Sequence, residues 1–205
     1  MFSKHYKTNT VFLFILLMLA AITSQAEATP RGEFILKQQP EPLPDFVLFD
    51  DNFKPLRKQS LQGHWTLIYF GYLNCPDVCP TTLQTLAEVQ SKLIAEGIKS
   101  LPEVVFVSVD PWRDTPKNIK QYVEYFNKDF IGASADAPQL NVLTNFFKII
   151  YYNNRSQQKI KDYEVAHSDQ VILINPKVEF VGAFRSPLDS RFIAQQLNRM
   201  MKQNP

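Results

Sequence analysis

The sequence lacks a hydrophobic run long enough for a membrane-spanning helix. Its longest apolar stretch, residues 11–22, is shorter than the roughly 20 apolar residues that a bilayer span needs. The stretch follows Lys4 and Lys7 and precedes small residues up to Ala26, which is the pattern of a secretory signal peptide. We therefore expect residues 1–26 to be cleaved on export, with a retained anchor as the competing interpretation. No cysteine follows the stretch directly, which excludes a lipoprotein anchor.

The sequence also lacks an excess of charge of either sign. It has 22 lysines and arginines against 20 aspartates and glutamates, and two of the lysines lie within the signal-like segment. A nucleic-acid-binding protein needs a basic excess to replace the counterions of the phosphates. We therefore expect no nucleic-acid partner, and no strong membrane contact once the signal peptide is cut. The rest of the chain has the length of one domain with a substantial core.

Cysteine is scarce, and both cysteines lie in one short segment. Cys75 and Cys79 are the only two in 205 residues, within GYLNCPDVCP at residues 71–80. The segment follows a strand-like run and opens a helical pattern, so we expect the positive end of that helix to favour thiolates. Thiolates bind soft metals or exchange with disulfides. In an oxidising compartment a Cys75–Cys79 disulfide is the default, although so short a loop gains little stability from it.

The apolar patterns predict strands and helices in alternation. Strands are expected at residues 46–49, 65–70, 104–109, 171–174 and 178–181, and helices at 80–96, 115–127, from 138 onward and at 189–200. Four prolines make residues 27–45 an expected extended linker, so that the domain is residues 46–205. Residues 134–136 are expected to form a loop, and residues 151–161 a loop or hairpin. The element order predicts an α/β fold, a thioredoxin-like mixed β-sheet flanked by helices, with an added hairpin.

Two thiolates alone rarely make a selective metal site, and histidine is scarce as well. After the signal-like segment the chain has only His64 and His167. His64 precedes the strand at residues 65–70, at the end opposite Cys75. His167 lies in a predicted loop that we expect to face the cysteines, although a solvated surface histidine is the other interpretation. If His167 does meet both sulfurs, the set favours Cu(I) and can also hold Cu(II) or zinc. Copper is preferred because zinc would be short of a fourth ligand.

Three segments together resemble the Sco/SenC family. They are FGY with CPDVCP at residues 70–80, VDPWRDTP at residues 109–116, and HS at residues 167–168 followed by an Asn-Pro turn at residues 175–176. Their order and spacing over roughly residues 40–200 are more specific than any single motif. The resemblance implies a thioredoxin-like copper-binding protein that helps to assemble the copper centre of cytochrome c oxidase. It also implies Cys75, Cys79 and His167 as the metal ligands.

From these observations we expect an exported copper chaperone, periplasmic or at the outer face of the inner membrane, and an accessory protein more than an enzyme. Cys75, Cys79 and His167 would bind one copper ion for a cytochrome c oxidase copper-bearing subunit or another acceptor. Oxidation to the Cys75–Cys79 disulfide should abolish binding. The alternative is a thiol–disulfide oxidoreductase acting on cysteines of a target, which should tolerate loss of His167. A peroxide-reducing enzyme ranks last.

The sequence departs from the family pattern beside two of the predicted ligands. Asn74 stands where a histidine is frequent, and Ala166 stands where an acid commonly precedes the metal histidine. These departures leave the Cu(II) affinity and redox potential open, but not the identity of the ligands. Asp110 ends a predicted strand and Asp114 precedes a predicted helix, so we expect both to act as caps.

Overall fold

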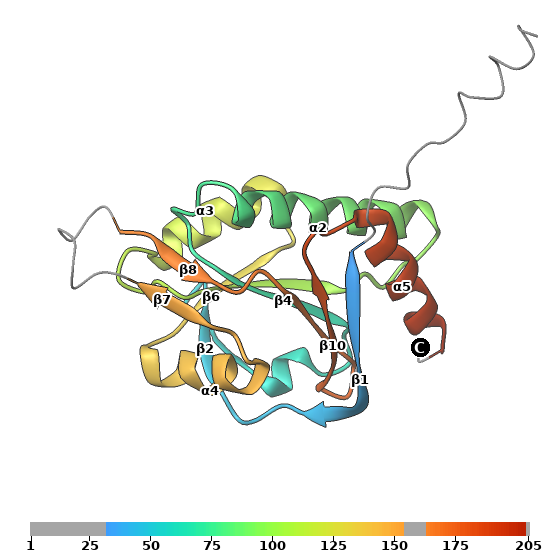
Figure 1. The fold of residues 1–205 in the computed structure, drawn as a ribbon, viewed down its shortest axis with the longest axis horizontal. Helices are drawn as coiled ribbons and strands as arrows, with labels where there is room; N and C mark the ends of the chain where they lie inside the picture. The colour runs from blue at the N-terminus through green and yellow to red at the C-terminus, as the bar shows by residue number, and fades with distance from the viewer. Residues whose placement is uncertain (1–31, 154–162, 204–205) are drawn as a thin grey trace, which may run out of the picture. The chain divides into compact units, whose positions relative to one another are not determined.

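Eight strands form one mixed sheet in the computed structural model, which describes residues 32–153 and 163–203. From edge to edge they are β1 (Glu33–Pro42), β10 (Glu179–Arg185), β9 (Val171–Ile174), β4 (Thr66–Gly71), β5 (Glu103–Ser108), β6 (Ile131–Ser134), β2 (Val47–Asp50) and β3 (Pro55–Arg57) (Figure 1). Strands β4, β5 and β6 are parallel, and the remaining pairs are antiparallel. The mixed sheet and its flanking helices confirm the predicted α/β class.

Strand β4 lies in the interior of the sheet, between β5 and β9. All six of its residues are buried, and a strand covered on both faces has the continuous apolar sequence by which it was predicted. The strand ends at Gly71, directly before the segment that carries both cysteines. The parallel strand β5 ends at the same edge of the sheet, with Ser108 opposite Gly71. This edge therefore collects the loops that follow both strands.

Helices cover both faces of the sheet (Figure 1). Helix α2 (Val78–Ala95) connects β4 to β5, and α3 (Pro116–Phe126) connects β5 to β6. Crossovers of this kind are right-handed, so two in the same direction place both helices on one face, where α5 (Ser190–Gln203) packs against α2. Helix α4 (Ala137–Phe147) lies on the other side and contacts β2, and a short 3-10 helix, η1 (Lys58–Leu61), follows β3.

A second sheet consists of two short antiparallel strands, β7 (Tyr151–Asn153) and β8 (Val165–His167). The predicted loop or hairpin at residues 151–161 lies mostly outside the described residues, but its first three residues form β7, which pairs with a strand beyond that segment. His167, which was expected in a loop, is instead the last residue of β8, opposite Tyr151. Strand pairing therefore fixes the backbone that carries the imidazole.

The structure contains strands that the sequence did not predict, among them the edge strand β1 and the interior strand β6. Part of the predicted linker at residues 27–45 is strand β1, which pairs with β10. Pro40 and Pro42 are tolerated there because an edge strand leaves one side of its backbone unpaired. Strand β6 includes Ser134, which was expected in a loop. Its four residues, Ile-Gly-Ala-Ser, are too few and too small to produce an alternating apolar pattern.

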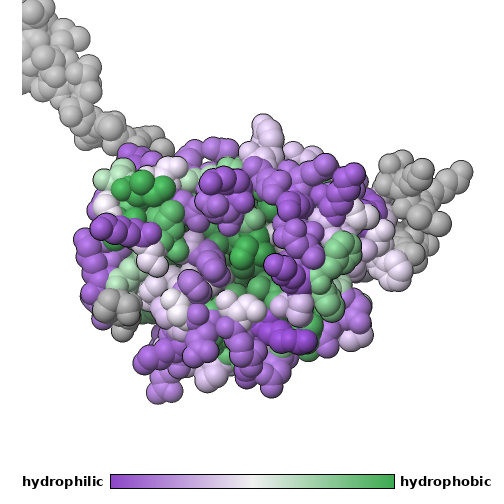
Figure 2. Space-filling view, turned by 180° about the vertical axis from the view of Figure 1, so that it is seen from behind, coloured by the Kyte–Doolittle hydropathy of each residue, from purple (hydrophilic) through white to green (hydrophobic). Residues whose placement is uncertain are grey.

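The predicted signal peptide, residues 1–26, lies outside the described residues. Over residues 32–153 and 163–203, none of the helices combines the length and the apolar character of a membrane span. The face turned away from the viewer in Figure 1 is mainly hydrophilic, with separated apolar areas between polar side chains (Figure 2). The buried apolar residues gather in one core cluster around the large sheet.

Candidate metal centre

Both cysteines follow β4, but the helix gives them different environments. Cys79 is fully buried, whereas Cys75 is half-buried in the loop before α2. The buried face of α2 runs from Cys79 through Leu83, Leu86 and Val89 at spacings of three and four residues, as expected for an amphipathic helix. Cys79 is therefore the first member of the apolar face of α2, and Cys75 lies at the surface beside it.

Gly71 leaves the space that the Cys79 side chain occupies. A Cβ atom at residue 71 would lie 2.7 Å from Cys79 Sγ and 2.8 Å from a ring carbon of Phe106. Both distances are shorter than real side-chain contacts allow. The last position of β4 must therefore be glycine if Cys79 is to keep its place under the end of the strand.

Strand β8 brings His167 to the two sulfurs. The distance from His167 Nε2 to Cys79 Sγ is 3.3 Å, and the ligand atoms of Cys75, Cys79 and His167 all lie within 4.8 Å of one another. His64 lies at the other end of β4, where its Nδ1 is 3.9 Å from Glu103. The structure thus brings Cys75, Cys79 and His167 together, as predicted, and places His64 elsewhere. The role of the three residues as metal ligands stays a prediction.

A backbone contact fixes the tautomer of His167. Its Nδ1 lies 2.9 Å from the carbonyl oxygen of Ser168, and a carbonyl oxygen can only accept. Nδ1 therefore carries the proton, and the lone pair of Nε2 points toward Cys79. Metal-binding histidines are oriented by such a partner on the second ring nitrogen. Here the backbone does this, while Ala166, where the family often has an acid, is exposed.

Burial changes the electrostatics of the site in a direction that the sequence did not indicate. Loss of hydration raises the pKa of the Cys79 thiol to about 12, so the expectation that the helix end favours a thiolate is wrong for Cys79 in the metal-free protein. Burial also raises the pKa of Tyr69, whose hydroxyl lies 3.5 Å from Cys79 Sγ and donates to it. Burial lowers the pKa of His167, which keeps the imidazole neutral.

The Cys75 sulfur lies at the amino end of α2. The backbone N–H of Cys79 donates to Cys75 Sγ at 3.4 Å, which is one of the helix donors that have no partner inside the helix. The Cys75 backbone N–H in turn donates to the Tyr72 carbonyl at 3.3 Å. These contacts direct the half-buried thiol toward Cys79 and His167.

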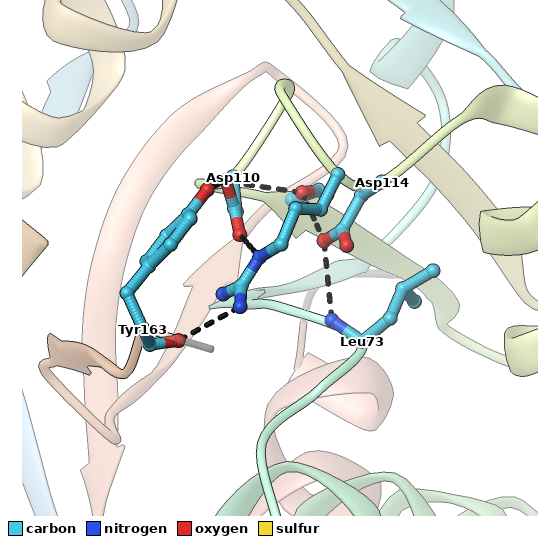
Figure 3. A network of polar contacts seen from close by, with 6 residues as sticks. Leu73, Asp110, Asp114 and Tyr163 are labelled. Atoms are coloured by element: carbon cyan, nitrogen blue, oxygen red, sulfur yellow. Dashed lines mark hydrogen bonds and ion pairs between the residues drawn. The ribbon is translucent and has the colours of Figure 1, made fainter. Parts of the chain in front are cut away.

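Two predicted caps have a different role. Thr115, and not Asp114, caps α3 by accepting from Asn118 N–H. Asp114 is buried, and its Oδ2 accepts from Ser108 Oγ at 2.6 Å and from Leu73 N–H at 3.1 Å (Figure 3). The capping predictions for Asp110 and Asp114 were wrong because both carboxylates are buried: Asp114 accepts from the cysteine segment, and Asp110 binds Arg113 and Tyr163.

Sequence reasoning missed Tyr69, Gly71 and Tyr163. Tyr69 and Gly71 adjoin the cysteine segment on β4, and the alternation of side chains along a strand could have placed both on the face that α2 covers. Tyr163 precedes β8 and contacts Asp110 and Arg113. No local pattern could have indicated that contact, because it depends on where the β7–β8 sheet lies.

A sequence model of the family described as SCO1/SenC matches residues 36–202 of the chain. Among known proteins, one from Stutzerimonas stutzeri whose name describes copper binding is 31% identical over 186 residues, which span 88% of this chain and 90% of that protein. The match thus covers the cysteine segment, the Asp-Arg segment and the strand with His167 together.

Two solved structures with copper bound are similar to this chain. Arabidopsis thaliana ScoI has a TM-score of 0.72 and 30% identity, over 78% of this chain and 98% of that one. Yeast Sco1 has a TM-score of 0.75 and 25% identity, over 81% and 91% of the two chains. These similarities confirm the predicted thioredoxin-like fold.

Proposed function

The chain belongs to the SCO1/SenC family, and from this premise we propose that it is an exported copper chaperone. It binds one copper ion through Cys75, Cys79 and His167 and transfers the ion to the copper-bearing subunit of a respiratory cytochrome c oxidase, or prepares that centre. The members of the Sco family are described as cytochrome c oxidase assembly proteins. This description supports the oxidase subunit as the acceptor of the copper ion. The protein acts as a carrier of metal more than as an enzyme.

One observation carries the proposal: three soft or borderline ligand atoms from two distant parts of the chain lie within 4.8 Å of one another. Metal–sulfur and metal–nitrogen bonds are roughly 2.0–2.3 Å long. The 3.3 Å between Cys79 Sγ and His167 Nε2 is shorter than two such bonds together, so one ion can reach both atoms. The tautomer of His167 supports the same conclusion, because its free lone pair is on Nε2.

The ligand set favours copper over zinc. Structural zinc takes four protein ligands and catalytic zinc takes three and a water, whereas two thiolates and an imidazole suit Cu(I). Among the described residues, the only group of three or more potential metal ligands is this one. Copper is the cargo here, and the site holds it with three ligands only, which leaves room for a ligand from the acceptor.

Transfer proceeds by ligand exchange from the Cys75 side. Cys75 is half-buried, while Cys79 is fully buried behind it. A hollow of about 280 Å³ beside the site is lined by Tyr72, Pro76, Tyr152, Glu164, Val165 and Ala166. An acceptor thiolate bonds to copper as the bond to Cys75 breaks, and Cys79 is released last. The oxidation state of copper does not change in this exchange.

The redox state of the two thiols controls loading. Two-electron oxidation by an external disulfide forms the Cys75–Cys79 bond, releases both thiol protons and reduces the oxidant to two thiols. The disulfide has no thiolate left for copper. Copper loading therefore requires the reduced protein.

The proposal is tested by equilibrium copper titration of the reduced protein and of Cys75→Ser, Cys79→Ser and His167→Ala. Each variant should lose at least about tenfold in affinity. His64→Ala is the matched control and should bind like the wild type, because His64 lies at the far end of β4. Undiminished affinity in all three ligand variants would end the proposal.

A thiol–disulfide oxidoreductase is the second candidate, and the different burial of the two thiols favours it. A half-buried Cys75 beside a buried Cys79 is the arrangement of an attacking and a resolving thiol. Reduction of a disulfide substrate should then survive in His167→Ala and disappear in Cys75→Ser. Loss of copper binding in His167→Ala with no reductase activity in the wild type would favour the chaperone.

We also propose export to the periplasm or to the outer face of the inner membrane, and the signal-like residues 1–26 support this proposal. Mass spectrometry of the exported protein should find a chain that begins at Glu27. A mature chain that still carries residues 1–26 would support a retained anchor instead.

A further inference from the structure

A buried charge network lies between the two parts of the chain that carry the predicted ligands (Figure 3). Asp110 and Arg113, in the loop between β5 and α3, form an ion pair through Asp110 Oδ2 and Arg113 Nε. Tyr163 donates its hydroxyl proton to Asp110 Oδ1 and accepts a hydrogen bond from Arg113 Nη1 at its carbonyl oxygen, at 2.7 Å. Tyr163 is therefore held through both its side chain and its backbone.

The Arg113 guanidinium also packs between two aromatic rings. Its central carbon lies 3.6 Å from the ring centroid of Tyr163 and 5.7 Å from that of Tyr72. Tyr72 precedes the cysteines, and its ring meets the His167 imidazole edge-on, with centroids 5.7 Å apart. Arg113 thus contacts the cysteine segment and the segment before β8 at once.

The same loop holds the cysteine segment through Asp114. Leu73, two residues before Cys75, donates its backbone N–H to Asp114 Oδ2 at 3.1 Å, and Ser108 donates its hydroxyl to the same oxygen at 2.6 Å. Asp110 N–H donates to Ser108 Oγ at 3.1 Å. Both carboxylates are therefore joined in one network that begins at the end of β5.

This network connects two sheets that do not share a ladder of hydrogen bonds. Cys75 and Cys79 follow β4 of the large sheet, whereas His167 ends β8 of the two-stranded sheet. Ion pairs that are buried as deeply as Asp110 and Arg113, whose side chains are 0% and 13% exposed, are weak contributors to stability, since desolvation offsets their attraction. Their value here is geometric, because they hold two separate ligand-bearing segments at one distance.

We propose that Asp110, Arg113 and Tyr163 are positioning residues for the copper site, which set the distance of His167 from the two cysteine sulfurs. The inference rests on the proposed function. The three residues act on the site through Tyr72 and through the chain from Tyr163 to His167. Partners of metal ligands commonly contribute 10- to 100-fold to metal affinity, so the network should matter by about one order of magnitude.

Two mild substitutions test the proposal. Tyr163→Phe removes the hydroxyl that binds Asp110, and Arg113→Lys removes the planar guanidinium that joins Asp110 to the Tyr163 carbonyl. Both should lower copper affinity about tenfold in competition titrations and shift the thiolate-to-Cu(II) absorption band. Asn127→Ala is the matched control, since it removes a remote hydrogen bond of 2.7 Å to the buried Gln90, and should reduce stability without changing affinity or the absorption band.

A second measurement separates positioning from general destabilisation. In a His167→Ala background, Tyr163→Phe and Arg113→Lys should have no further effect on copper affinity, because they act through that imidazole. Unchanged affinity and spectrum in both variants, or equal losses with and without His167, would overturn the inference while leaving the proposed function intact. If Cys75→Ser, Cys79→Ser and His167→Ala all bind copper as tightly as the wild type, the proposed function fails instead.

Discussion

Loss of water shifts the pKa values of Cys79 and His167 in opposite directions. Burial raises the pKa of the Cys79 thiol and lowers the pKa of His167, so both side chains are neutral in the metal-free protein at pH 7. The Tyr69 hydroxyl and the His167 lone pair then face the same sulfur. A cation entering between Cys79 and His167 meets no competing positive charge on the imidazole, but it must displace the thiol proton.

Copper affinity should therefore rise with pH. The pKa of Cys79, about 12, means that copper replaces a proton on this sulfur throughout the neutral range. Affinity should increase at least about tenfold per pH unit between about pH 6 and 9. Because burial lowers the pKa of His167, its protonation contributes less to this slope than that of a solvated imidazole. Competition titrations at several pH values measure this dependence. His167→Ala should show the same slope of affinity against pH. A copper affinity that does not change with pH would contradict the prediction.

Gly71→Ala should disturb Cys79 directly. The new methyl group would lie 2.7 Å from Cys79 Sγ, so the helix end or the sulfur must shift. We expect a loss of about 1–3 kcal/mol in the free energy of unfolding, measured by denaturant titration, together with weaker copper binding.

Gly132→Ala provides the control for the glycine substitution. Its methyl group would lie 2.3 Å from Ile119 Cγ2, between β6 and α3. It should be destabilising too, but should leave copper affinity unchanged. Equal affinity losses in both variants would mean that Gly71 has no specific relation to Cys79.

At the scale of elements, the loop between β5 and α3 has two functions. Its last residues start α3 through the Thr115 cap, while the Asp114 carboxylate accepts a hydrogen bond from Leu73 in the cysteine segment. Asp114 is 3% exposed, and burial raises its pKa to about 6, against the hydrogen bonds from Ser108 and Leu73, which lower it. Asp114 therefore changes its charge near pH 6, within the range in which the protein can be studied.

Asp114→Asn should change how stability depends on pH. Between the unfolded pKa of 3.8 and the folded pKa of about 6, the folded state binds the proton more tightly, so this residue's contribution to stability falls as pH rises through that range. An asparagine does not titrate, so it does not lose this stabilisation as pH rises. Its side-chain oxygen can still accept hydrogen bonds from Ser108 and Leu73. Relative to the wild type, the variant should therefore gain stability from pH 4 to pH 6.5 in denaturant titrations. A difference that does not change with pH would contradict the prediction.

At the scale of the whole molecule, β1 closes the sheet at the edge beyond β10. Phe34 packs on the buried Phe184 with ring centroids 4.4 Å apart. A Cβ atom at Gly182 would lie 2.5 Å from the Ile35 carbonyl oxygen. The backbones of β10 and β1 can therefore approach closely because residue 182 has no side chain. Residues 33–42 are therefore part of the domain and cover one end of its core.

Phe34→Ala should destabilise the domain by about 1–3 kcal/mol, since the ring is only partly buried. A linker residue would change stability by less than about 0.5 kcal/mol. Denaturant unfolding distinguishes the two outcomes. Copper affinity should stay at the wild-type value, because β9 and β10 separate β1 from β4 and its cysteine segment.

Local sequence patterns determined the four long helices of the described residues, the buried strand β4, and the position of both cysteines at the start of α2. These features depend on periodicity within about ten residues, and on the preference of proline and small polar residues for helix starts. The sequence could also have predicted the burial of Cys79, because Cys79 lies four residues before Leu83 on the apolar face of the helix. The scarcity of histidine made His167 a candidate, and the family resemblance implied its role as a ligand.

Tertiary structure alone decided which distant side chains meet. His167 and Cys79 are 88 residues apart in sequence and 3.3 Å apart in space, and Tyr163 reaches Asp110 across 53 residues. Such contacts depend on how the two-stranded sheet packs beside the large one, which no local pattern encodes. The same packing removes water from Cys79 and raises its pKa, because hydration is a property of the folded environment and not of the residue.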